Sequence, residues 1–93
     1  MGFTLVIEQQ SEDVFAVTIC DTNTTNHTVT VTDETLLDLT DNLVSKISLL
    51  EFSFKFLLER EPNTSILASF DINVISRYFS NYSDEVKSWC DEG

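Results

Sequence analysis

The stretch HTVTVTDETLLDL, residues 27–39, decides the fold because the period of its apolar residues changes at Thr32. Up to Val31, valines alternate with threonines, which is the two-residue period of a strand with one buried face. From Asp33 onward the leucines follow helical spacing, and the Thr32 hydroxyl suits an N-cap. Asp33 and Glu34 would then lie in the first turn, where carboxylates interact favourably with the helix dipole. The sequence therefore predicts an α+β fold in which a strand leads directly into a helix.

Two further strand-like runs precede this point. Residues 3–8 and 14–20 are rich in β-branched and aromatic side chains, and the polar stretch 9–13 separates them. Such runs, joined by a short polar segment, are typical of a hairpin. Together with residues 27–32 they predict an N-terminal three-stranded antiparallel meander. We expect the threonines of the third strand to lie on a solvent-exposed face.

A long helix over about residues 33–60 is predicted next. Leucines recur every seven residues from Leu36 to Leu57, and Pro62 supplies a stop. Residues 48–57 also alternate as in a strand, but no Gly, Pro or Asn-rich turn precedes them, so helix is favoured. An unbroken helix would measure about 42 Å, longer than the diameter of about 32 Å expected for such a domain. It must therefore break near residues 45–48, or project and bury its apolar excess against another copy or a partner.

The C-terminal third is predicted to form helices over about residues 64–91. Apolar residues from Ile72 to Trp89 recur at spacings of three and four, which marks one side of a helix. A break at Ser80–Asn81 would instead give two shorter helices. No linker divides the chain, so residues 1–93 are expected to form a single domain.

Composition and cysteine usage favour a cytoplasmic protein. The 93 residues are 42% hydrophobic, which is enough for one core. No stretch reaches the roughly 18 apolar residues of a membrane span. Cys20 and Cys90 fit no Cys-x-x-Cys spacing, so we expect two buried free thiols. No cofactor or metal is predicted, because the chain has neither a glycine-rich phosphate loop nor a calcium-loop pattern.

The sequence offers little for catalysis. His27 is the only histidine, and we interpret it as an exposed side chain on an edge strand. The alternative is that His27 meets Cys20 across the turn between their strands and acts as a base for the thiol. Acidic surroundings disfavour a reactive thiolate, and no oxyanion donors are evident. We therefore expect a protein that is not an enzyme.

Negative charge is concentrated in the N-terminal half. The formal net charge is −11, and no lysine or arginine precedes Lys46. The carboxylates of that stretch are Glu8, Glu12, Asp13, Asp21, Asp33, Glu34, Asp38 and Asp41. Nucleic-acid binding needs lysines and arginines to displace counterions, so we expect no direct contact with nucleic acid. A surface of one sign instead attracts cationic partners.

The leading functional prediction is therefore an inhibitor or regulator that docks through these carboxylates on a basic protein partner. Carboxylates spaced along a strand and a helix could occupy the positions that phosphates take in a nucleic-acid-binding groove. Antitoxins, nuclease immunity proteins and phage-encoded inhibitors of defence systems act in this general way. The opening hairpin also resembles that of HicB-type antitoxins; the resemblance ends after the hairpin, and no residue role follows from it.

The alternative is a structural homodimer or assembly subunit built on the leucine-rich helix. Its predicted interface consists of Leu36, Leu43, Leu50, Phe52, Phe56 and Leu57. The acidity would then serve solubility. So many apolar residues are also typical of a helix packed within its own domain, which leaves both interpretations open.

Overall fold

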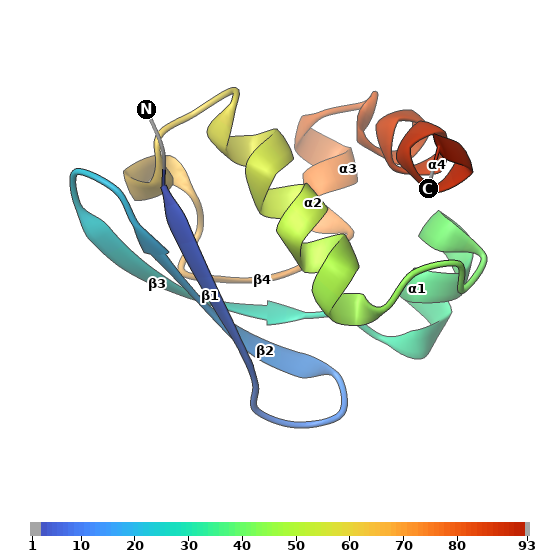
Figure 1. Ribbon diagram of the computed structural model, residues 1–93, viewed down its shortest axis with the longest axis horizontal. Helices are drawn as coiled ribbons and strands as arrows, with labels where there is room; N and C mark the ends of the chain where they lie inside the picture. The colour runs from blue at the N-terminus through green and yellow to red at the C-terminus, as the bar shows by residue number, and fades with distance from the viewer. Residues whose placement is uncertain (1–2, 93) are drawn as a thin grey trace.

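The computed structural model describes residues 3–92 and contains a four-stranded sheet with helices on one of its faces (Figure 1). In chain order the elements are β1 (Thr4–Gln9), β2 (Val14–Cys20), β3 (Thr24–Thr30), α1 (Asp33–Thr40), α2 (Lys46–Leu58), the 3-10 turn η1 (Asn63–Ser65), β4 (Ser69–Asp71), α3 (Val74–Tyr78) and α4 (Tyr82–Glu92). The predicted α+β class is confirmed. No helix among these residues has both the length and the apolar character that crossing a membrane requires.

The first three strands form the predicted antiparallel meander in the order β1-β2-β3. Side chains alternate between the two faces, so Phe15, Val17 and Ile19 of β2 are buried beneath the helices. Strand β4 pairs parallel to β3, with Val29 opposite Phe70, and the sequence does not predict it. A strand of three residues is too short to show a period, and only the returning chain creates its pairing.

The predicted long helix is broken into α1 and α2. Asp41 and Asn42 have φ of 54° and 60°, in the left-handed region, and the Asp41 N–H donates to the Leu37 carbonyl oxygen at 2.8 Å. Ser45 then caps α2, its hydroxyl accepting from the Ser48 N–H at 3.1 Å. The longest extent of the molecule is 34 Å. An unbroken helix of about 42 Å would have exceeded it. The single helix over 33–60 is therefore wrong, and the break that replaces it spans residues 41–45 rather than the expected 45–48.

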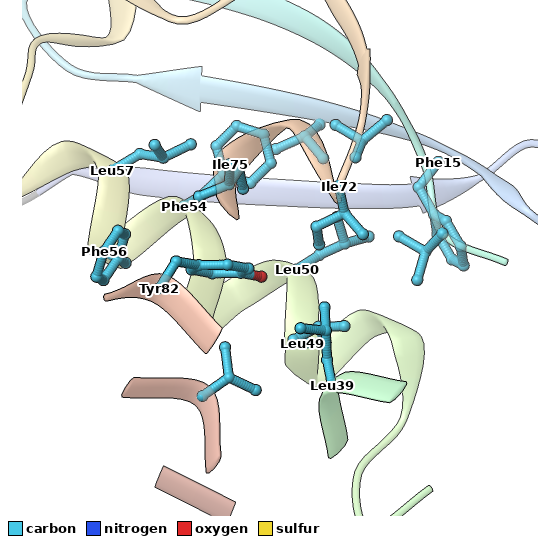
Figure 2. Close-up of a cluster of buried hydrophobic side chains, with 14 of the residues drawn as sticks. Phe15, Leu39, Leu49, Leu50, Phe54, Phe56, Leu57, Ile72, Ile75 and Tyr82 are labelled. Atoms are coloured by element: carbon cyan, nitrogen blue, oxygen red, sulfur yellow. The ribbon is translucent and has the colours of Figure 1, made fainter. Parts of the chain in front are cut away.

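Helix α2 lies between the sheet and the C-terminal helices, which explains why its apolar residues follow helical and strand-like spacings at once. Phe54 is fully buried and packs toward the sheet side of the core (Figure 2). On the other side, Phe56 meets Tyr82 with ring centroids 5.3 Å apart. Phe52 stacks on Trp89 with centroids 4.7 Å apart. A helix covered on several sides needs apolar residues on several sides.

The C-terminal third contains two short helices, as the alternative with a break at residues 80–81 predicts. Residues 64–71 form η1 and β4 rather than the predicted helix. Asn63 explains this difference, because its buried amide donates to the Asn23 carbonyl oxygen at 2.8 Å and to Thr25 Oγ1 at 3.0 Å. These contacts hold the segment beside β3, from where it enters the sheet.

Candidate protein-interaction surface

Lys46 brings the β1–β2 loop and the start of α1 together. Its ammonium lies 3.0 Å from Asp13 Oδ1 and 2.8 Å from Asp33 Oδ1, and it donates to the Glu12 carbonyl oxygen at 3.0 Å. The hydrogen bond to Asp33 is the main reason that the pKa of Lys46 is raised above its ordinary value of 10.5. The charge of Lys46 is thus offset by two carboxylates, and the loop stays net negative.

The exposed side of α1 carries three more carboxylates around a leucine. Glu34, Leu37, Asp38 and Asp41 follow each other at i, i+3, i+4 and i+7, and all four are exposed. Asp38 lies in the last turn and Asp41 is the C-terminal cap, and the last turn of α1 has no basic residue. Carboxylates at this position face the negative end of the helix dipole and reduce stability.

The C-terminal end of α4 lies beside the C-terminal end of α1 (Figure 1). The last turn of α4 also lacks a basic residue, and Asp91 there is exposed. Burial, and then the charges of Asp91 and Asp41, raise the pKa of the Cys90 thiol between them. Two negative helix ends and their carboxylates therefore share one region. We call the resulting surface the acidic strip; it comprises Glu12, Asp13, Asp33, Glu34, Asp38, Asp41 and Asp91.

Two of the predicted carboxylates lie outside the acidic strip. The first is Asp21, which follows β2. Asp13, a member of the strip, precedes β2, so Asp13 and Asp21 lie at opposite ends of a strand about 23 Å long. Glu8 is exposed on the helix-free face of the sheet, opposite Ala16. The fold therefore gathers six of the eight predicted residues. It adds Asp91, which sequence reasoning missed because α1 and α4 are far apart along the chain.

The alternative pairing of His27 with Cys20 does not form. His27 is 3% exposed on an interior strand, not exposed on an edge strand, because β4 covers the outer edge of β3. Its Nδ1 donates to the Leu67 carbonyl oxygen at 2.7 Å, and Nε2 lies 2.9 Å from Thr25 Oγ1. Cys20 is exposed, contrary to the prediction of two buried thiols, and it pairs with Thr24 on the face opposite to His27. The Nδ1 bond thus ties β3 to the segment before β4, and the Nε2 contact stays within β3.

Most of the predicted oligomer interface is packed inside this chain. Leu50, Phe56 and Leu57 are at most 4% exposed and belong to the core (Figure 2). Leu36 and Phe52 are partly buried against the same core. Leu43 differs, at 63% exposed. A dimer through the three core side chains would require the domain core to open.

Among residues 3–92, no group of three or more His, Cys, Asp or Glu side chains is placed to hold a metal ion.

A cleft of about 410 Å³ lies between the C-terminal end of α2, the segment before β4, and α3. Sequence reasoning missed this cleft because it treated residues 64–71 as helix.

Comparison with known proteins gave no matching family model, no matching curated protein and no matching solved structure.

Proposed function

We propose that the protein is a non-enzymatic inhibitor or regulator that docks through the acidic strip on a basic surface of another protein. The observation that carries the proposal is the meeting of two helix C-termini that bear Asp41 and Asp91. Basic residues would stabilise both ends. Proteins tend to break such local rules at functional sites, where charge is retained at a cost in stability.

The α1 face also has the layout of a small interface. Leu37 is 48% exposed, and Glu34, Asp38 and Asp41 surround it at helical spacing. An apolar centre that loses water on binding, within a charged rim, is the common anatomy of protein interfaces. The rim carboxylates would speed encounter with a basic surface, including one that binds nucleic acid, and Leu37 would slow dissociation.

The test is a pull-down of the tagged protein from a lysate of its native source, washed in low salt and eluted with a salt step. The triple variant Glu34→Gln, Asp38→Asn, Asp41→Asn removes three charges from the acidic strip without touching the Lys46 contacts. We expect it to lose the salt-eluted partner and to weaken the measured dissociation constant by about tenfold or more.

A matched control removes the same number of charges elsewhere. Glu8→Gln, Asp21→Asn and Glu51→Gln are changes at exposed carboxylates outside the acidic strip and give the same net charge. This control should retain the partner. If both triple variants lose it equally, only net charge matters and the proposed surface is wrong. If the wild type retains no basic protein, docking on a basic partner is wrong.

A further inference from the structure

The cleft between α2 and α3 has the size and lining of a site for a small molecule. Its volume is about 410 Å³, and sites for small ligands typically span about 300–1,000 Å³. Its apolar lining consists of Leu57, Ile66, Leu67, Phe70, Val74, Ile75 and Phe79. Leu67 and Tyr78, at 47% and 69% exposed, stand at its margin. A ligand with an apolar body would bury these surfaces.

One ionised group lines the cleft. Glu61 is half-buried, and its carboxylate forms no salt bridge or side-chain hydrogen bond within residues 3–92. The neighbouring Arg60 does not neutralise it, because the guanidinium lies over the Phe56 ring at 3.6 Å and donates to the Phe56 carbonyl oxygen at 2.9 Å. The cleft thus combines an apolar body with a free negative charge.

The charge and the aromatic rings select the same type of ligand. A carboxylate attracts a cation, and the faces of aromatic rings such as Phe70, Tyr78 and Phe79 do so as well. The net charge of −11 disfavours anionic ligands such as fatty acids. The volume of about 410 Å³ is in the range of small-molecule sites, so a small ligand is the occupant that we argue for.

We propose that this cleft binds a small organic ammonium with an apolar body, the ammonium pairing with Glu61 and the body lying against Leu67, Phe70 and Val74. The site is independent of the acidic strip. Figure 1 shows α1 at one end of the molecule and the gold η1 turn, which borders the cleft, at the other. The cleft and the strip can therefore be tested separately.

The experiment is a two-dimensional amide NMR titration of the whole chain with three probes of similar shape. These are 2-phenylethylammonium, the neutral 2-phenylethanol and the anionic 3-phenylpropanoate. We expect saturable shifts at Leu67, Val74 and Tyr78 with the ammonium, about tenfold weaker binding of the alcohol, and still weaker binding of the carboxylate. Equal affinities for the three probes, or no saturable shift at these amides, would overturn the proposal.

Two variants of equal charge separate the site from general attraction to an acidic protein. Glu61→Gln should reduce ammonium binding about tenfold, to that of the alcohol, whereas Glu59→Gln, at an exposed neighbour outside the lining, should leave it unchanged. Equal effects of the two variants, or shifts confined to the acidic strip, would contradict the site. Should Glu61→Gln lose its dispersed spectrum, the order of the three probes on the wild type still decides.

A peptide probe tests the alternative that a segment of a partner protein occupies the cleft. If a blocked Leu-Lys dipeptide gives the same shifts at a lower concentration than 2-phenylethylammonium, the cleft belongs to a segment of a partner protein. That result would overturn the small-ligand proposal.

Discussion

Helices α1 and α2 begin alike and end differently. Thr32 caps α1 and Ser45 caps α2, each accepting a hydrogen bond from the N–H three residues later. At its C-terminus, α2 has Lys55 in the last turn, and just beyond it Arg60 donates to the carbonyl oxygen of Phe56. Helix α1 instead ends with Asp38 in its last turn and Asp41 as its cap.

The difference shows how one chain divides its tasks. Helix α2 has a basic residue, Lys55, in its last turn, where positive charge stabilises a helix, and it buries side chains on several sides. Helix α1 buries only one side and places charge where the helix dipole disfavours it. Under the proposed function, α2 belongs to the core and α1 to recognition; of the three predictions that follow, the first and the third test that division.

The largest expected effect comes from equal truncations in the two helices. Leu50 is fully buried and Leu37 is 48% exposed. Leu50→Ala should lower the free energy of unfolding by about 2–5 kcal/mol, because it leaves a cavity in the core. Leu37→Ala should change it by less than about 0.5 kcal/mol. Urea unfolding followed by circular dichroism measures both; similar losses would show that α1 is part of the core rather than a recognition element.

The second prediction is a loss of folding stability at alkaline pH, caused by Tyr82 where α4 packs on α2. Tyr82 is fully buried and shares a hydrogen bond with Ser53, and burial raises its pKa above the ordinary value of 10.0. Above pH 10 the unfolded chain releases this proton while the folded chain keeps it. The folded state then binds more protons, so stability should fall by up to about 1.4 kcal/mol per pH unit.

Tyr82→Phe should flatten this part of the stability profile, and Tyr78→Phe, at a tyrosine 69% exposed, is the matched control. Lys46 adds a loss of the same sign, because its raised pKa makes its contribution complete below about 10.5 and lost as pH rises further. Chemical denaturation at a series of pH values from 8 to 12 is the measurement, those values bracketing the roughly pH 10 onset. An equal alkaline slope in Tyr82→Phe and wild type would remove Tyr82 from the explanation.

The smallest expected effect is a change in the free energy of unfolding that has opposite signs at the C-terminal ends of α1 and α2. Asp38→Asn and Asp41→Asn should each raise the free energy of unfolding by about 0.3–1 kcal/mol, because they remove charge from a negative helix end. Arg60→Gln should lower it by about 0.5–1 kcal/mol, through loss of the contact with the Phe56 ring. Thermal unfolding at low salt is sensitive enough, and added salt should shrink the gain. Destabilisation by both asparagines would show that α1 is tuned for stability after all.

Local patterns were sufficient for part of this architecture. The meander, the Thr32 cap and the helical state of residues 48–57 follow from residue type and spacing, because each depends on neighbours within a few positions. The position of the α1–α2 break did not follow, since Asp41 and Asn42 adopt left-handed backbone without a glycine to mark it. The acidic character of α1 was equally visible in the sequence, but its proximity to Asp91 was not.

By itself, the sequence determined the fold class, the three-stranded meander and the sign of the charge, because these depend on composition and on periods of two or 3.6 residues. The tertiary structure decided that β4 joins the sheet, that His27 is buried, that the carboxylates split between strip and sheet, and that a cleft opens beside Glu61. The β4 pairing and the burial of His27 join residues about 40 positions apart, and the cleft joins residues from Leu57 to Phe79. Such contacts form only when the chain closes on its core, and no local pattern encodes their partners.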